Sequence, residues 1–333
     1  MKRVAINGLG RIGRMVVRHY MDMRPKDVEL VAANDLVPPD DLAYLLKYDS
    51  VHGRAAFPVS VSGDRISMGD VDLKIVAEKD PAQLPWKKLG VDAVVESTGF
   101  FTKRELAAKH LQAGARRVII SAPSADADIT IIIGVNEKEF RPEQHKVISD
   151  ASCTTNSLVP PLKVMLDSFG IERALVTTIH AYTGTQGLVD KPSKKRIRGR
   201  AAAVSLVPTT TGSDVATTMV LPELKGRLRA LAVRAPIPDG AITDIVADLR
   251  KPVTVKDVNG AFKAASEGAM KGILGYTEDE LVSADIIDDL HSGIVHALST
   301  IVVQDTMVKV QVWYDNEFGY SRRLLDTIAL LPV

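Results

Sequence analysis

A glycine-rich segment near the N-terminus constrains the fold of this 333-residue chain more than any other feature. The segment Asn7-Gly8-Leu9-Gly10-Arg11-Ile12-Gly13 contains the pattern G-x-G-x-x-G. It follows the strand-like run Val4–Ile6 and opens the helix-like run Gly10–Met23, and Asp35 ends the next strand-like run, Val28–Ala33. This order is typical of the first βα turn of a dinucleotide-binding domain.

Each glycine of the motif has its own expected task. Gly8 permits the tight turn, Gly10 lets a pyrophosphate approach the backbone, and Gly13 lets the helix pack on the sheet. The unpaired N–H groups of the helix N-terminus would bind the phosphates. Asp35 would accept hydrogen bonds from a ribose diol and repel a 2′-phosphate, so NAD is expected and NADP is possible. The alternative is a glycine-rich turn that binds nothing.

The first half of the chain alternates short apolar runs with amphipathic ones. Such alternation predicts a mainly parallel, doubly wound (Rossmann) sheet covered by helices on both sides. Further strands are expected at Val71–Ala77, Ala93–Glu96, Val118–Ser121, Ile129–Ile133 and Val147–Ser149, and a further helix at Thr102–Ala113.

The second half predicts an α+β domain with a mainly antiparallel sheet, and the boundary is expected near residue 150. Strands are expected at Leu175–Ile179, Ala230–Ala235, Ala241–Leu249 and Met307–Tyr314, and helices at Ser152–Phe169, Val255–Ala265 and Ser321–Leu331. Because a proline costs about 3 kcal/mol inside a helix, Pro160-Pro161 predicts a kink or short break in the first of these helices.

Composition excludes several classes of function. The chain has 42 basic and 41 acidic residues, which argues against a nucleic-acid or membrane-surface protein. A single cysteine excludes an internal disulfide and a Cys-rich metal site, so no metal is expected. The absence of a signal-peptide pattern and of an apolar run of about 20 residues leads us to expect a cytoplasmic protein without membrane association.

That single cysteine is a candidate nucleophile. Cys153 lies in Ala151-Ser152-Cys153-Thr154-Thr155-Asn156, after a strand-like run and at the start of a helix-like one. The positive end of the helix would lower the pKa of the thiol. His180, at the end of another strand, is a candidate base. The alternatives are a cysteine buried as a small apolar side chain and a structural histidine.

A basic segment between Lys191 and Arg200 contains six Lys and Arg residues. It could bind nucleic acid, form a solvated loop, or supply a cation to an anion site. We expect the last of these.

The chain resembles phosphorylating glyceraldehyde-3-phosphate dehydrogenases along almost its whole length. The resemblance is carried by residues 7–14 and by Lys47-Tyr48-Asp49-Ser50-Val51-His52-Gly53, Glu96-Ser97-Thr98-Gly99, residues 151–156, His180-Ala181-Tyr182-Thr183, Pro208-Thr209-Thr210-Thr211-Gly212 and Trp313-Tyr314-Asp315-Asn316-Glu317.

The resemblance implies roles for individual residues. Cys153 would be the catalytic nucleophile and His180 its partner. Cofactor contacts would come from Gly8, Gly10, Arg11, Ile12, Gly13, Asp35, Lys79, Ser121, Asn316 and Tyr320. The substrate phosphate would be bound by Thr183, Thr185 and Arg234, inorganic phosphate by Ser152, Thr154, Thr211 and Gly212, and Arg198 would lie between the two.

The resemblance also implies the organisation and the reaction. A cofactor domain would span residues 1–151, and a catalytic domain 152–316 would contain an S-shaped loop at about 182–205. A C-terminal helix, 317–333, would return to the cofactor domain, and the protein would form a homotetramer. The reaction would convert D-glyceraldehyde 3-phosphate to 1,3-bisphosphoglycerate in glycolysis or gluconeogenesis. It would reduce NAD(P), pass through a thioester on Cys153, and use inorganic phosphate to release the product.

Three positions depart from the pattern common in the family, and a fourth, Lys191, bears on the choice of cofactor. Asp150 replaces an asparagine and would raise the pKa of Cys153 if it is charged. Ser157 replaces a second cysteine, which removes one route to an oxidative disulfide. Lys79 replaces an arginine, and Lys191 would attract a 2′-phosphate, whereas Asp35 favours NAD.

Three rival functions follow from the same residues. An erythrose-4-phosphate dehydrogenase would be expected to change the Thr183–Thr185 pair, which is intact here. A semialdehyde dehydrogenase of amino-acid biosynthesis would lack the Trp313–Tyr320 segment. A catalytically silent protein that binds RNA or a partner would not need Cys153 and His180.

Overall fold

The computed structural model describes residues 1–332, and these form two compact units. The first unit comprises Met1–Ala151 and Ser321–Val333, and the second comprises Ser152–Tyr320. Val333, the last residue of the expected C-terminal segment, lies outside the described residues. Within residues 1–332, every helix is too short or too polar to cross a membrane.

The first unit is built on a nine-stranded sheet in the order β10-β11-β9-β8-β1-β2-β7-β6-β5. All neighbours from β10 to β7 are parallel, and β5, β6 and β7 form an antiparallel edge. The strands are β1 (Lys2–Asn7), β2 (Val28–Asn34), β5 (Val59–Ser62), β6 (Arg65–Met68), β7 (Val71–Val76), β8 (Ala93–Glu96), β9 (Arg117–Ile120), β10 (Ile129–Thr130) and β11 (Val147–Ser149). The predicted mainly parallel sheet is confirmed.

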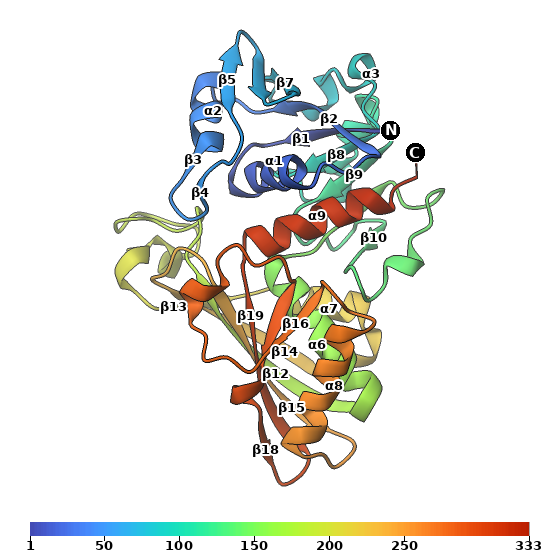
Figure 1. The fold of residues 1–333 in the computed structure, drawn as a ribbon, viewed down its shortest axis with the longest axis vertical. Coiled ribbons are helices and arrows are strands. Elements are labelled where there is room, and N and C mark those ends of the chain that lie inside the picture. The colour runs from blue at the N-terminus through green and yellow to red at the C-terminus, as the bar shows by residue number, and fades with distance from the viewer. Residues whose placement is uncertain (333) are drawn as a thin grey trace. The chain divides into compact units, whose positions relative to one another are not determined.

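Central strands of this sheet are apolar on both faces. Every residue of β8 and of β9 is buried, as a parallel sheet covered on both sides requires. The helices of this unit are α1 (Arg11–Met23), α2 (Pro39–Lys47), α3 (Trp86–Leu89), α4 (Arg104–Ala107) and α5 (Lys109–Gln112), and a short hairpin joins β3 (Tyr48–Asp49) to β4 (Gly53–Arg54). Figure 1 shows α1 beside β1 and β8.

Residues of the C-terminal helix α9 (Phe318–Leu330) from Ser321 onward belong to the first unit. The Nζ of Lys2 donates hydrogen bonds to the carbonyl oxygens of Ala329, at 2.7 Å, and Ile328, at 3.3 Å. The Oγ1 of Thr327 donates to Oδ1 of Asp150 at 2.6 Å. These bonds tie the end of the chain to its beginning.

The second unit is built on an eight-stranded sheet in the order β13-β14-β12-β15-β19-β17-β16, with β18 paired to β19. Most neighbours are antiparallel, as predicted, and β12–β14 and β16–β17 are parallel. The strands are β12 (Ile171–Ala181), β13 (Val207–Thr210), β14 (Leu228–Ala235), β15 (Ala241–Leu249), β16 (Leu274–Thr277), β17 (Gly293–His296), β18 (Ile301–Val303) and β19 (Met307–Tyr314).

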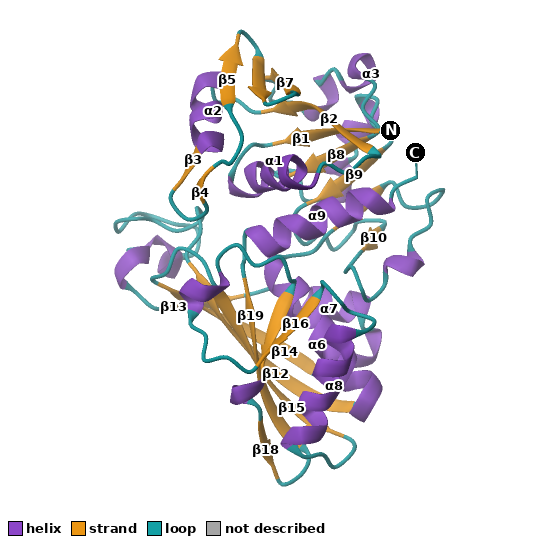
Figure 2. Cartoon of the chain, in the orientation of Figure 1, coloured by secondary structure: helices purple, strands orange, loops and turns teal. Residues whose placement is uncertain are grey.

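Helices cover one face of this second sheet. Figures 1 and 2 show α6 (Cys153–Phe169), α7 (Ser213–Val220) and α8 (Val255–Glu267) on the same side of its strands. Burial alternates along β15, with every second residue fully buried and those between partly exposed. The sheet therefore has one covered face and one uncovered face within this chain.

The expected helix at Thr102–Ala113 is wrong in detail, because it divides at Ala108 into α4 and α5. The N–H of Leu111 bonds to the carbonyl oxygen of Ala108, three residues earlier, at 3.0 Å. This tight 3₁₀-type turn interrupts the regular α-helical ladder.

Of the kink or short break expected at Pro160-Pro161, the break is wrong, because α6 runs without interruption from Cys153 to Phe169, and the kink stays a prediction. Leu158, Leu162 and Met165 on this helix are completely buried. Each contributes about 1.5–3 kcal/mol on burial, which offsets the cost of the two prolines.

Candidate functional site

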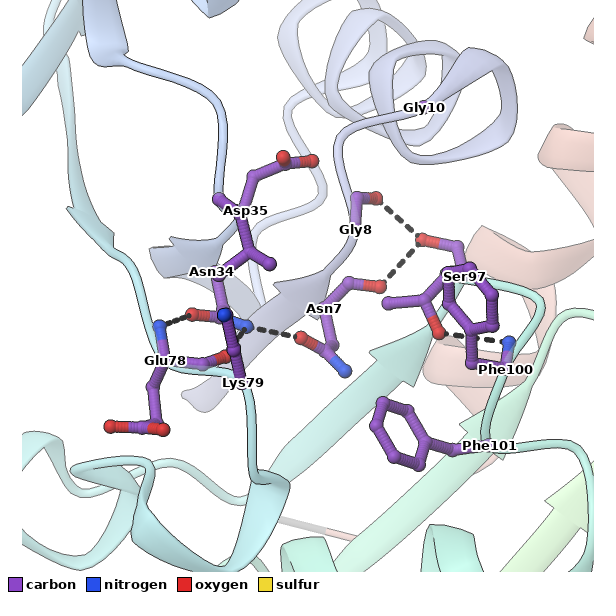
Figure 3. Close-up of a pocket in the computed structure, with 12 residues that line it drawn as sticks. Asn7, Gly8, Gly10, Asn34, Asp35, Glu78, Lys79, Ser97, Phe100 and Phe101 are labelled. Carbon is purple, nitrogen blue, oxygen red and sulfur yellow. Dashed lines mark hydrogen bonds between the residues drawn. The ribbon is translucent and has the colours of Figure 1, made fainter.

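A pocket of about 320 Å³ opens at the carboxyl ends of parallel strands in the first unit. It is lined by Asn7, Gly8, Gly10, Asn34, Asp35, Leu36, Glu78, Lys79, Ser97, Thr98, Phe100 and Phe101. Figure 3 shows Asn34, Asp35, Glu78 and Lys79 on one side of it and Ser97, Phe100 and Phe101 on the other. In open parallel sheets, ligands bind at this edge of the strands.

The three glycines of the motif differ in what surrounds them. Gly8 has a φ of +94°, and a Cβ there would lie 2.9 Å from the N of Thr98. A Cβ on Gly13 would lie 2.1 Å from the carbonyl oxygen of Gly8. A Cβ on Gly10 would meet no protein atom within 4 Å among the described residues, and Gly10 lines the pocket. Gly8 and Gly13 therefore shape the turn, and the space beside Gly10 fits a phosphate at the helix N-terminus.

Asp35 is held at the pocket by the backbone. Its Oδ2 accepts from the N–H of Leu9 at 2.8 Å, and its Oδ1 accepts from the N–H of Val37 at 3.0 Å. An ionised carboxylate has further lone pairs, so Asp35 can still accept hydrogen bonds from a diol.

Other predicted cofactor contacts in the first unit lie elsewhere. The guanidinium of Arg11 is paired with the carboxylate of Asp49, which directs this side chain to the β3–β4 hairpin. Among the described residues, Arg11, Ile12, Gly13 and Ser121 are not part of the pocket lining, whereas Lys79 is.

Several lining residues were missed by the sequence analysis. Asn7 ends β1, Asn34 ends β2, and Ser97 follows β8. The Oδ1 of Asn7 accepts from the Nδ2 of Asn34 at 2.7 Å, and the Oγ of Ser97 donates to the carbonyl oxygen of Gly8 at 2.8 Å (Figure 3). Their common signal is a polar residue at the carboxyl end of a parallel strand. Phe100 also lines the pocket and is 80% exposed, and an aromatic residue in a loop is the signal that could have identified it.

In the second unit, Cys153 is the first residue of α6. The Oγ of Ser152 caps this helix by accepting from the N–H of Thr155 at 3.1 Å. The Sγ of Cys153 lies 3.3 Å from Nε2 of His180, which stands near the end of β12. Two side chains 27 residues apart thus form a nucleophile and base pair of suitable geometry.

The predicted lowering of the thiol pKa is wrong for this protein. Burial raises the pKa of Cys153 to about 11, although the charge of Arg234 and hydrogen bonds from Thr154 act in the other direction. Burial, together with the positive charge of Arg234, lowers the pKa of His180 to about 3. Burial therefore opposes the charged form of both groups, because removing a charged group from water costs more than these partners return.

Arg234 contacts His180 from the neighbouring strand β14, where the two residues are paired in register. Its Nη1 lies 2.7 Å from Nδ1 of His180 and donates to the carbonyl oxygen of Ala181 at 2.8 Å. Nδ1 also lies 2.7 Å from that carbonyl oxygen.

The other predicted phosphate-binding residues of this unit bond to one another or to close neighbours. The hydroxyls of Thr183 and Thr185 are 2.9 Å apart. Arg198 donates to Oγ1 of Thr209 at 3.0 Å and to the carbonyl oxygen of Thr210 at 3.2 Å. The Oγ1 of Thr211 accepts from the N–H of Ser213, next to Gly212. The hydroxyl of Thr154 is buried against that of Tyr314, at 3.0 Å.

Asn316 and Tyr320 are buried in the second unit. The N–H of Asn316 donates to Oδ1 of Asp239 at 3.2 Å, while its side-chain Oδ1 is buried without a hydrogen-bond partner among the described residues. Such an oxygen fits the amide N–H of a nicotinamide carboxamide. Asp239 was missed by the sequence analysis; burial and the nearby Asp315 raise its pKa to about 8.

Asp150 lies completely buried in the first unit. Burial raises its pKa to about 7, against the hydrogen bond from Thr327 and the charge of Arg323. Burial is the main cause of the raised pKa of Cys153, and the acidic group that raises this pKa further is Asp239. The expected effect of Asp150 on the thiol stays a prediction.

Known proteins are similar to this chain over almost its whole length. Residues 2–104 match the family model of the glyceraldehyde 3-phosphate dehydrogenase NAD binding domain, and residues 152–316 match that of its C-terminal domain. Glyceraldehyde-3-phosphate dehydrogenase of Geobacillus stearothermophilus is 53% identical over 99% of this chain and 98% of the relative. Glyceraldehyde-3-phosphate dehydrogenase 1 of Bacillus subtilis is 52% identical over the same shares, and that of Nostoc sp. is 50% identical over 97% and 95%.

Proposed function

Because this chain belongs to the glyceraldehyde-3-phosphate dehydrogenase family, we propose that it oxidises D-glyceraldehyde 3-phosphate to 1,3-bisphosphoglycerate with NAD and inorganic phosphate. The observation that supports this most directly is the 3.3 Å approach of the Cys153 thiol to the His180 imidazole. The relatives named above all carry this activity in their names, which favours it over erythrose-4-phosphate dehydrogenase.

The chemistry begins with the sulfur of Cys153. As Sγ attacks the aldehyde carbon, the thiol proton leaves and the carbonyl oxygen becomes the hydroxyl of a hemithioacetal. His180 is the nearest base, and its neutral state allows it to take the hydroxyl proton in the oxidation that follows. NAD, when bound, accepts the hydride. A thioester on Cys153 remains.

Phosphate then completes the reaction. A phosphate oxygen attacks the thioester carbon, the bond to Sγ breaks, and the thiolate takes back the proton held by His180. The hydroxyl groups of Ser152 and Thr211, the backbone near Gly212, and the guanidinium of Arg198 would bind this phosphate, while Thr183, Thr185 and Arg234 would bind that of the substrate. Neutral hydroxyls with one arginine suit a phosphate that must bind and then leave.

NAD is the preferred cofactor in this proposal. Asp35 lines the pocket and presents a carboxylate where a 2′-phosphate would add negative charge. Lys79 lines the same pocket, so NADP use at lower efficiency is compatible with these residues. The ratio of kcat/KM for NAD and NADP tests this weighting, and a preference for NADP would overturn it.

We propose that residues 1–151 form the cofactor domain and that residues 152–316 form the catalytic domain, which includes the loop at 182–205. The C-terminal helix, 317–333, would return to the cofactor domain. We also propose that the protein works in the cytoplasm, where a lone catalytic thiol stays reduced.

A homotetramer is the assembly that we propose. The uncovered face of the second sheet carries Leu175, 66% exposed, and Leu231, 62% exposed, together with Val246. Leu175 of β12 pairs with Val246 of β15 and with Arg229 of β14, and Leu231 lies two residues after Arg229. Paired residues, and residues two apart on a strand, point to the same face of a sheet, so these side chains lie on one face. Apolar exposure of this kind is typical of subunit contacts. Leu231→Asp should reduce the mass measured by light scattering, and an unchanged mass would remove this face from the assembly.

The test of the activity follows reduced nicotinamide formation with glyceraldehyde 3-phosphate, with and without inorganic phosphate. We expect sustained turnover only with phosphate, none for Cys153→Ser, and less with erythrose 4-phosphate. Full activity of Cys153→Ser, or release of free acid without phosphate, would contradict the proposal.

A further inference from the structure

A row of polar side chains crosses the carboxyl ends of three neighbouring parallel strands in the first unit. Glu96 ends β8, Asn7 ends β1 and Asn34 ends β2. Asn7 is paired in register with Glu96 on one side and with Asn34 on the other. All three residues are buried, and the side chain of Glu96 is only 1% exposed. Because residues paired in register point to the same face of a sheet, these side chains lie side by side at the edge where the pocket opens.

Backbone groups fix the direction of the hydrogen bonds at the β2 end of this row. The Oδ1 of Asn34 accepts from the N–H of Glu78 at 2.8 Å, and its Nδ2 donates to the carbonyl oxygen of Glu78 at 2.9 Å. A backbone N–H only donates and a carbonyl oxygen only accepts, so the amide of Asn34 has one possible orientation. The same Nδ2 therefore donates to Oδ1 of Asn7 at 2.7 Å (Figure 3), and Nδ2 of Asn7 donates to Oε2 of Glu96 at 2.5 Å.

A side chain of the core fixes the direction of the hydrogen bonds at the other end of the row. The indole N–H of Trp86 can only donate, and it lies 2.9 Å from Nδ1 of His110. Because Nδ1 is the acceptor of this bond, the proton of the neutral imidazole is on Nε2. Nε2 therefore donates to Oε2 of Glu96 at 2.9 Å. Oε2 thus receives hydrogen bonds from two side chains, and neither bond can reverse its direction.

The other carboxylate oxygen of Glu96 holds the segment that follows β8. Its Oε1 accepts from the N–H of Thr98 at 2.9 Å and from the hydroxyl of the same residue. The Oγ1 of Thr98 in turn accepts from the N–H of Phe100 at 3.1 Å. Each of these contacts presents a donor to Glu96, which suits a carboxylate because both of its oxygens accept hydrogen bonds.

Glu96 therefore connects the two walls of the pocket. Through Oε1 it holds the segment Thr98–Phe100, which belongs to one wall. Through Oε2 it holds Asn7, and Asn7 holds Asn34 and with it Glu78 on the other wall (Figure 3). Among the described residues, the pocket lining does not include Glu96, so this side chain acts through its neighbours. A buried polar network in which every member is satisfied makes one arrangement rigid.

We propose that Glu96 is a positioning residue for the adenosine half of NAD, because its carboxylate sets the separation of the two pocket walls before the cofactor binds. Asp35 and Lys79 lie on the wall that Asn34 and Glu78 belong to (Figure 3). A ligand that finds both walls in place loses less free energy to ordering them, so this preorganisation increases the affinity. The inference rests on the proposed function only for the identity of the ligand.

Glu96→Gln tests the proposal with almost no change in shape. The NH₂ of the new amide must face either Asn7 and His110 or Thr98, and in both cases a donor then faces a donor. Calorimetric titration with adenosine diphosphoribose, which lacks the nicotinamide ring, should show binding weaker by at least about tenfold, because a buried hydrogen-bonding group loses its partner. The KM for NAD should rise by a similar factor, and kcat should stay near that of the wild type, since a positioning role in the pocket affects binding rather than chemistry.

Two control variants separate positioning from stability. Trp86→Phe removes a donor from the same network but leaves the bonds that Asn7 and Thr98 make to Glu96. It should lower the melting temperature and keep the affinity for adenosine diphosphoribose. Glu29→Gln is the same substitution at a partly exposed residue of β2, and it should change neither quantity.

The proposal fails if Glu96→Gln binds adenosine diphosphoribose as tightly as the wild type, or if kcat falls while the KM for NAD is unchanged. An equal loss of affinity in Trp86→Phe would also overturn it, because affinity would then only follow stability. If Glu96→Gln does not fold, Glu96→Asp gives the answer. Its carboxylate is one methylene shorter and cannot reach both Asn7 and Thr98, so weaker binding is expected and wild-type affinity would refute the proposal.

The affinity for adenosine diphosphoribose is measured without turnover. Absence of the dehydrogenase activity proposed above would therefore leave the role of Glu96 standing. An unchanged affinity in Glu96→Gln would remove that role and leave the proposed activity standing. A wild-type protein that does not bind adenosine diphosphoribose would overturn the assignment of the pocket, and the role of Glu96 with it.

Discussion

Asp150 should make the stability of the protein fall as the pH rises. Its side chain is completely buried, and burial raises its pKa to about 7 from an ordinary value of 3.8. Between these two pH values the folded protein keeps a proton that the unfolded chain has released. Raising the pH through this window therefore favours unfolding, and Asp150→Asn, which cannot ionise, should not show this loss.

The magnitude follows from the width of the window. Each pH unit changes the free energy of unfolding by about 1.4 kcal/mol, and the window spans about 3 units, so the loss is about 4 kcal/mol. At about 2.1 cal/mol/K of unfolding entropy per residue, this is about 6 °C for 333 residues. The Oγ1 of Thr327 can still donate to the Oδ1 of an asparagine, so the substitution removes the charge and keeps the contact.

The assay compares melting temperatures of wild type and Asp150→Asn at pH 4, 6 and 8, at one protein concentration. We expect similar values at pH 4 and a variant that melts about 6 °C higher at pH 8. Asp40→Asn, the same change at an exposed residue of α2, is the control and should follow the wild type at every pH. If the Asp150→Asn curve runs parallel to that of the wild type, burial does not hold a proton on Asp150.

Three further changes test the packing. Gly10→Ala should keep the melting temperature but weaken NAD binding at least about tenfold in calorimetry, since its Cβ would meet only the ligand. Gly13→Ala should lower both the melting temperature and the affinity for NAD, because its Cβ would lie 2.1 Å from the carbonyl oxygen of Gly8. Phe262→Ala should cost about 3–5 kcal/mol in urea unfolding, because this ring is completely buried; a loss below about 1 kcal/mol would show that the site collapses. His110→Phe should cost about 1–3 kcal/mol in the same assay, because it leaves the buried N–H of Trp86 without the acceptor that now lies 2.9 Å away, while Oε2 of Glu96 keeps its hydrogen bond from Asn7; equal stability would mean that water replaces the lost bond.

Local signals in the sequence were enough for much of the fold. The strands β1, β2, β8, β15 and β19 and the helix α1 lie within one or two residues of their predicted ranges. Three helices, α2, α3 and α7, were not predicted. For α2 a signal was present, with Pro39 at the start and Asp40 and Asp41 in the first turn. The sequence of α7 gives little signal for a helix, because it is rich in Val and Thr, and β-branched residues have low helix propensity.

The sequence by itself determined the features that depend on residues close together along the chain. These are the alternation of strands and helices, the turn at Gly8 and the position of Cys153 at a helix start. These follow from backbone sterics and hydrophobic periodicity, which are local. Only the tertiary structure decided that His180 meets Cys153, that Arg234 reaches His180, and that burial outweighs the helix N-terminus at the thiol. Desolvation and Coulomb interactions depend on distance in space, and no spacing along the sequence measures that distance.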